Sequence, residues 1–283
     1  MLLSMLAHLT FPGRVSGRLP RLCWLLLWLC STMPAQAQQV FLEDLTSPEL
    51  RAAIRAGTTT VIVPAGGTEQ NGPHMTLGKH NARVRLLAGK IAAALGNTVV
   101  APVLAYVPEG SIAPPTAHMR FAGTISITDE AFRATLAAAA RSLKQHGFKD
   151  VVLIGDHGGY QAQLEAVAAR LNREWAGSGT RAHFVAAYYR SSQEAYAAAL
   201  RAKGLTEAQI GTHAGSADTS LQLALAPDSV RADKIVAAAQ DGAQAGVAGD
   251  PRAASAALGH AGVELIVQQS TAAIRAAVAA PRP

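Results

Sequence analysis

The sequence predicts an α/β fold in a single domain, in which helices cover both faces of a mostly parallel central sheet. Hydrophobic residues make up 49% of the chain and charged residues only 16%, so it can bury a large core. From about residue 58, short β-branched runs alternate with long alanine-rich stretches. Neither an internal repeat nor a linker rich in Pro, Gly or Ser divides this pattern. We therefore expect a three-layer α/β/α domain.

The first half of the pattern contains three strands and two helices. Short apolar or β-branched runs predict strands at Thr58–Val63, Thr98–Ala101 and Val151–Ile154. Longer alanine-rich stretches predict helices at Ala82–Leu95 and Thr128–Gln145. The run at 151–154 is wholly apolar, which is typical of a strand buried on both faces of a parallel sheet.

The second half continues the alternation. It predicts a helix at about 161–174, a strand at 183–188, and helices at 192–203, Asp218–Leu225 and Val263–Val278. In open parallel sheets, ligands bind beyond the carboxyl ends of the strands. We therefore expect the functional residues in the loops that follow Val63, Ala101 and Ile154.

The first 37 residues have the features of a secretory signal peptide. Three arginines precede the apolar run Leu22–Cys30, and Ala35 and Ala37 supply small residues at positions −3 and −1 of a cleavage site. A membrane anchor is the less favoured interpretation, because the run is well short of the ~20 residues of a spanning helix. We expect cleavage near Ala37 and a periplasmic or secreted domain formed by residues 38–283.

Removal of this leader changes two properties of the chain. Both cysteines, Cys23 and Cys30, lie within it, so no disulfide is expected in the mature domain. The leader carries three arginines and no acidic residue, so the formal net charge falls from +6 to +3. That charge is too small to indicate nucleic acid as a partner. The remaining hydrophobic runs are too short to cross a membrane, so no membrane partner is expected after processing.

Glycine-flanked histidines and carboxylates follow two of the predicted strands. The segment after Val63 contains four glycines, two prolines, Glu69 and two histidines, of which His80 is the last. The strand at 151–154 leads into Asp156 and His157, between glycines. A further His213 precedes Asp218. One interpretation is a metal site and the other is a set of turn-rich connections, with Asp218 as a plain helix N-cap.

Five segments resemble the creatininase family of metal-dependent amidohydrolases. They occur in the family's order, from about Val61 to the C-terminus: Pro64–His80, His118–Ser126, Gly155–Tyr160, His213–Ser220 and Gly249–Ser255. The resemblance implies two divalent metals, with Glu69, His157 and Asp218 as ligands. It also implies a homo-oligomer.

Two substitutions change the metal ligands that the resemblance implies. Asn71 stands where the family has a histidine, and His80 where it has a metal-bridging aspartate. An amide is a poor zinc ligand and a neutral imidazole cannot bridge two cations. The remaining set of Glu69, His80 and His157 suits one catalytic zinc with an open position for water. We expect zinc, in one or two copies per chain, with manganese as an alternative at a second position.

Once that set holds the zinc, His213, Asp218 and Asp156 are candidates for proton transfer or for a second, weaker metal position. His74 and His118 also match family positions, and hydrogen bonding in the core or behind the metal ligands is the alternative for each.

The predicted activity is metal-dependent hydrolysis of a C–N bond in a small amide, cyclic or not. The alternative is a catalytically silent relative that binds a metal or ligand. Absence of G-x-S-x-G and of a strand-linked G-x-G-x-x-G disfavours a serine hydrolase and a dinucleotide enzyme. Trp175 is the only tryptophan beyond the leader, so one chain cannot build a pocket of several indoles around creatinine.

Overall fold

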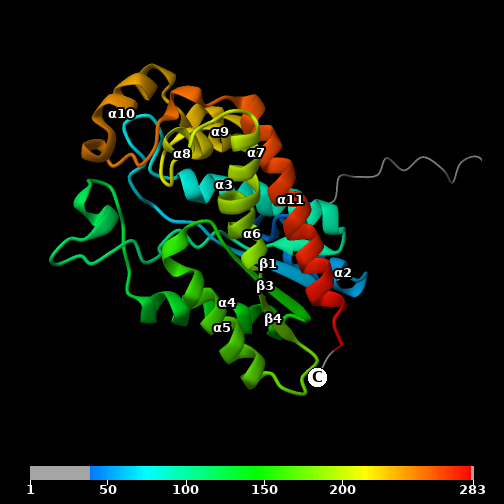
Figure 1. Cartoon of the computed structure of the whole chain (residues 1–283). Helices are drawn as coiled ribbons and strands as arrows, with labels where there is room; N and C mark the ends of the chain where they lie inside the picture. Colours follow the sequence, from blue (N-terminus) through cyan, green and yellow to red (C-terminus); the bar gives the residue numbers. More distant parts are fainter. Residues whose placement is uncertain (1–38, 282–283) are drawn as a thin grey trace, which may run out of the picture. The chain divides into compact units, whose positions relative to one another are not determined.

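The central sheet has four parallel strands in the order β2-β1-β3-β4, of which Figure 1 labels β1, β3 and β4. The computed structural model describes residues 39–281, so the predicted signal peptide at 1–37 lies outside the described residues. The strands are β1 (Thr60–Ala65), β2 (Thr98–Val100), β3 (Asp150–Gly155) and β4 (Arg181–Phe184). Every residue of β1 and β3 is buried, as their apolar sequences predict for the centre of a parallel sheet.

One face of the sheet packs against two helices. Side chains alternate along a strand, so Val61 and Val63 of β1 lie on the same face as Leu153 of β3. They share a core with apolar residues of α4 (Asp129–Gln145) and α5 (Gln161–Glu174). Figure 1 shows these two helices together on one side of the strands.

The opposite face forms a second core. Ile62, Val152 and Ile154 point to it and pack with residues of α3 (Lys79–Leu95) and α11 (Ala256–Ala279). Because both faces are covered, the domain has the three-layer α/β/α arrangement that the sequence predicts. The fold class is therefore confirmed.

Shorter helices complete the domain. They are α2 (Ser47–Arg55), α6 (Ala186–Arg190), α7 (Tyr196–Ala202), α8 (Glu207–Ile210), α9 (Ser216–Leu225) and α10 (Ile235–Asp241). A third, small apolar cluster connects the loop after β1 to the region of α9 and α10, and it contains Met75, Ala214, Val230, Ala238 and Val247. This cluster holds the chain segment around His213 against the carboxyl end of β1.

The strand predicted at 183–188 is wrong in its position. β4 ends at Phe184, after pairing with Leu153, and α6 begins at Ala186. The edge position explains the difference, because β4 has one neighbouring strand and the following alanine and tyrosine side chains pack as a helix against the second core. No helix within residues 39–281 is long and apolar enough to cross a membrane.

Candidate metal centre

The polar residues of the predicted site gather at the carboxyl ends of β1, β2 and β3. The loop after β1 carries Glu69, the long connection between β2 and α4 carries Glu109 and His118, and β3 leads directly into His157. The backbone approaches closely here: Gly67 has φ +147°, and a Cβ at this position would lie 2.5 Å from a Glu109 carboxylate oxygen. A side chain at this position would be strained by the backbone and would have to displace the Glu109 carboxylate.

A four-residue cluster of Glu69, Glu109, His118 and His157 has the composition of a metal site. One ligand atom from each residue lies within 4.8 Å of the others. Both histidines place Nε2 near Glu69 Oε2, at 3.3 Å for His118 and 3.4 Å for His157. The same Nε2 of His157 lies 3.4 Å from Glu109 Oε2. Two imidazoles and two carboxylates therefore converge on one point.

Three of the four carboxylate oxygens in this cluster have no hydrogen bond among the described residues. Glu69 Oε2 and both Glu109 oxygens are buried without a hydrogen bond within residues 39–281. Burial, and then the charge of Glu69, raise the pKa of Glu109 to about 9. Buried carboxylates without donors are costly, and a bound cation is one way to compensate them.

Both imidazoles of the cluster are oriented through Nδ1. The Gly159 amide donates to Nδ1 of His157 at 3.0 Å, and Nδ1 of His118 lies 3.2 Å from the Gln70 side-chain nitrogen. Burial lowers the pKa of both rings, to about 3 for His157, where the charge of His80 adds to the effect. With Nδ1 accepting, the proton of the neutral ring lies on Nε2, so a metal bound there must displace it.

Glu69 also belongs to an ion-pair network beneath the cluster. We use this name for Glu69, Lys79, His80, Arg83, Asp156 and Asp218. His80 places Nε2 2.7 Å from Glu69 Oε1 and Nδ1 2.5 Å from Asp156 Oδ2. Since ionised carboxylates only accept hydrogen bonds, both ring nitrogens donate and neither offers a lone pair to a metal.

Buried cations hold the other carboxylates of the network. Arg83 donates to Asp156 Oδ2 at 2.8 Å and to Asp218 Oδ1 at 2.6 Å, and Lys79 lies 3.1 Å from Asp218 Oδ2. Burial alone would raise the pKa of Asp218, but Lys79 and Arg83 hold it well below its usual range. Three carboxylates therefore face two basic side chains and a doubly donating imidazole, and the charges of the network balance.

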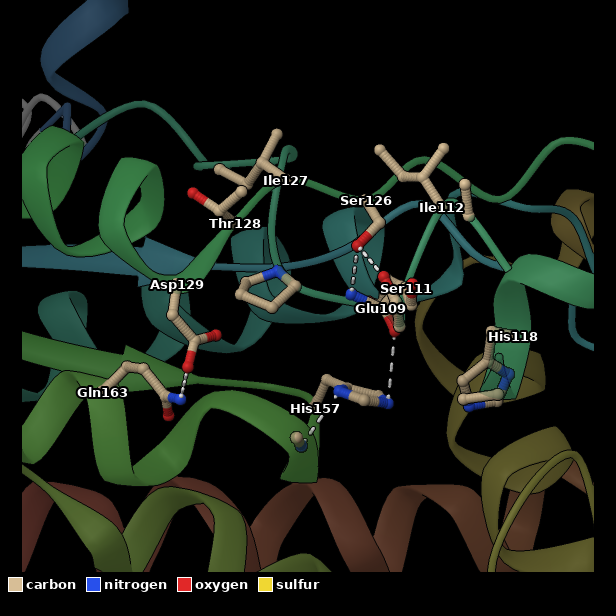
Figure 2. Close-up of a pocket in the computed structure, with 15 residues that line it drawn as sticks. Glu109, Ser111, Ile112, His118, Ser126, Ile127, Thr128, Asp129, His157 and Gln163 are labelled. Carbon is tan, nitrogen blue, oxygen red and sulfur yellow. Dashed lines mark hydrogen bonds and ion pairs between the residues drawn. The ribbon is translucent and has the colours of Figure 1, made fainter. Parts of the chain in front are cut away.

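Among the described residues, two pockets are lined by both histidines of the cluster. The larger has a volume of about 710 Å³ and includes Glu109, His118 and His157 in its wall (Figure 2). The smaller, of about 270 Å³, is lined by the same two histidines together with His213 and members of the network. A ligand in the larger pocket would therefore contact the four-residue cluster directly.

One protein-family model matches most of this chain. The creatininase family model, described as creatinine amidohydrolase, matches residues 43–274. The chain belongs to the creatininase family. Its family match covers the sheet, the four-residue cluster and the ion-pair network together, and members with solved structures share the fold.

Individual relatives of this creatininase-family chain include two kinds of hydrolase. A mycofactocin precursor peptide peptidase of Mycolicibacterium smegmatis is 32% identical over 181 residues, which is 62% of each protein. The chain thus matches less than two thirds of that relative's length. The creatinine amidohydrolase of Pseudomonas putida is 28% identical over 71% of this chain and 77% of its own. A solved manganese form of creatininase superposes with a TM-score of 0.71 at 25% identity, over 86% of this chain and all of its own.

The structure brings two of the four predicted metal ligands into the four-residue cluster. Glu69 and His157 lie in it, whereas His80 and Asp218 lie in the ion-pair network. Asp156, predicted as a proton-transfer residue, is bound there by Arg83, His80 and Tyr188.

The candidate proton-transfer residue His213 lies between the two groups. Its Nδ1 is 3.6 Å from Glu69 Oε1, and its Nε2 lies 2.9 Å from the Gln70 carbonyl oxygen.

Glu109 is the site residue that the sequence did not reveal. It follows Pro108 in the long connection between β2 and α4, and no histidine or second carboxylate stands within eight residues of it in the sequence. His118 lies in the cluster itself, while His74, the other histidine that matches a family position, is fully buried and hydrogen-bonded to Thr219. Asn71, in place of a family histidine, donates to two backbone carbonyls and holds the loop.

Proposed function

We propose that this chain is a metal-dependent hydrolase that cleaves a C–N bond of an amide, with one divalent ion held by Glu69, Glu109, His118 and His157. The observation that carries the proposal is the set of three buried carboxylate oxygens without hydrogen-bond partners in the described chain. They face two imidazole Nε2 atoms at the wall of a pocket. This donor set suits zinc, with manganese as the alternative.

One ion is proposed because the second position is filled by side-chain cations. Lys79 and Arg83 are buried, at 1% and 4% exposure, beside the carboxylates that could hold another metal. A second divalent ion would add positive charge to a network whose charges already balance. Solved creatininases include a zinc–zinc form, so this chain would differ from that relative in metal count.

A bound ion would lower the pKa of its water to about 7 and polarise the amide carbonyl. We assign proton transfer to His213. Burial, and then the charge of Lys79, lower the pKa of His213 to about 4, so the ring is neutral near pH 7. Its Nε2 is anchored on the Gln70 carbonyl, which leaves Nδ1 as the acceptor that faces Glu69. In this proposal, Asp156 and Asp218 act as positioning residues.

The proposed substrate is an amide larger than creatinine. The pocket that includes the cluster has a volume of about 710 Å³, which is in the range of about 300–1,000 Å³ for sites that bind drug-sized ligands. One relative is named a peptidase of a peptide precursor and another a creatinine amidohydrolase, and one solved creatininase is a complex with creatine. A short peptide or an N-substituted amide fits the pocket volume better than a single small ring.

The test is hydrolysis of a panel of short peptides and amides by the full chain after chelation and after return of zinc or manganese. We expect activity only with metal, and a loss of about 100-fold or more in Glu109→Gln, because the variant removes one ligand. Glu165→Gln changes an exposed carboxylate on α5 and should leave the rate unchanged. Equal rates in Glu109→Gln and wild type, or full activity without metal, would overturn the proposal.

A catalytically silent relative is the second candidate function. It is favoured by the Nδ1 contacts of His118 and His157, which put the ring protons on Nε2. In that case Glu109 stays protonated and binds a ligand rather than a metal. Absence of both hydrolysis and metal uptake across the panel, in a folded protein, would favour this alternative.

A further inference from the structure

The larger pocket contains a second polar group away from the four-residue cluster. Asp129 and Gln163 line it from the first turn of α4 and from α5. The Gln163 amide donates to Asp129 Oδ2 at 2.6 Å. Figure 2 shows this pair at one side of the pocket, with Glu109 and His118 toward the other and His157 between them.

Both side chains line the pocket and carry hydrogen-bond acceptors. A carboxylate only accepts hydrogen bonds, so Gln163 must direct its NH₂ group at Asp129 and keep Oε1 for another donor. That Oε1 is buried and has no hydrogen-bond partner within residues 39–281. No described basic residue forms an ion pair with Asp129. Two acceptors therefore lie together without a donor.

Neither acceptor is needed to cap the helix. Thr128 is the N-cap of α4 and its hydroxyl already accepts from the Ala131 amide. The nearby Arg133 pairs with Glu130, 3.1 Å away, and not with Asp129. No lysine or arginine is among the described residues that line this pocket. No described side chain therefore supplies a positive group to Asp129, which only the N-terminus of α4 and solvent compensate unless a ligand brings one.

We infer that Asp129 and Gln163 form a subsite for a positively charged group of the substrate, either a primary ammonium or a guanidinium. The inference rests on the proposed function for the identity of the pocket as the substrate site. Between the subsite and the cluster the wall is largely apolar, with Ile112, Ala113 and Ile127. The pocket thus suits an amide whose carbonyl lies at the cluster and whose cation lies at the end of an aliphatic chain.

The test compares two series of probes by ligand-observed NMR titration: ω-aminoalkanamides of increasing length and alkanamides of matched length. We expect the full chain to bind the best amino compound about tenfold more tightly than its neutral match. Asp129→Asn should remove this preference without changing the affinity for the neutral amides. Gln163→Leu, which removes Oε1 and the contact to Asp129, should reduce it several-fold and serves as the second variant if Asp129→Asn does not fold.

The matched control is Glu130→Gln, which removes the adjacent carboxylate of the same helix outside the pocket. It should retain the full preference for amino compounds. No preference in wild type, an undiminished preference in Asp129→Asn, or an equal loss in Asp129→Asn and Glu130→Gln would overturn the subsite. Titrations of chelated and zinc-loaded protein separate the two proposals. A preference that depends on Asp129, without metal uptake or hydrolysis, supports the subsite and contradicts the hydrolase. Metal uptake and hydrolysis without that preference support the hydrolase and contradict the subsite.

Discussion

The four-residue cluster and the ion-pair network share Glu69 and are both buried, but they differ in how their charges are compensated. In the network, each carboxylate faces a basic side chain or His80 at 2.5 to 3.5 Å. In the cluster, the Glu109 carboxylate has two buried oxygens without a hydrogen bond inside the described chain. The first group is complete without a ligand, whereas the second is compensated only by a proton or a cation.

This difference separates two uses of buried carboxylates in one site. Asp156 and Asp218 look like ligands in the sequence because they stand in family motifs, yet Arg83 binds both of them. Glu109 stands in no recognised motif and has the environment that a metal ligand needs. What surrounds a carboxylate, and not its motif, therefore indicates whether it is available to an ion.

The largest effect on stability should come from breaking the network at Arg83. Arg83→Met leaves Asp156 and Asp218 buried without their shared cation, and we expect the free energy of unfolding to fall by about 3–5 kcal/mol. Chemical denaturation measures the loss. Arg85→Met is the matched control on the same helix, because Arg85 pairs with Glu43 at the surface and its removal should cost about 1 kcal/mol or less. Similar losses in the two variants would show that the network contributes little.

A smaller and opposite effect is expected from Glu109. After chelation, Glu109→Gln should raise the free energy of unfolding by about 1–3 kcal/mol, because it replaces a buried carboxyl that lacks partners. Addition of zinc at about 100 times its dissociation constant should stabilise wild type by about 2.7 kcal/mol and leave the variant nearly unchanged. Thermal unfolding with and without zinc measures both. If the chelated variant were less stable than wild type and zinc stabilised it normally, Glu109 would not be a metal ligand.

Most of the fold could be predicted from the sequence because the strands are short apolar runs between long alanine-rich helices. β1 and β3 lie within a residue or two of their predicted bounds, since a strand buried on both faces must be apolar throughout. β4 is displaced because an edge strand is held by one neighbour, and its length depends on packing that the local sequence does not encode.

The site was less predictable than the fold. Motifs identified Glu69, His80 and His157, and parallel topology explains why they meet at one edge of the sheet. The structure was needed to show that His80 has no free nitrogen, since its two carboxylate partners come from different loops. Glu109 could not be recognised because the path of the long connection after β2 decides its position, and no periodic pattern marks that path.

The central claim is that internal charge balance limits this site to one metal ion, and metal content per chain tests it most directly. His80→Asp replaces the imidazole that donates to Glu69 and Asp156 with another carboxylate, so the network loses its balance and should attract a second divalent ion. Asn71→His alone changes a buried amide without adding charge to the network and serves as the comparison.

Elemental analysis of the purified full chain after dialysis against zinc gives the metal content of each variant. The account predicts about one ion per chain for wild type and for Asn71→His, and a rise towards two for His80→Asp, with or without Asn71→His. Two ions in wild type would contradict it, as would an empty wild-type site in folded protein or no gain in His80→Asp.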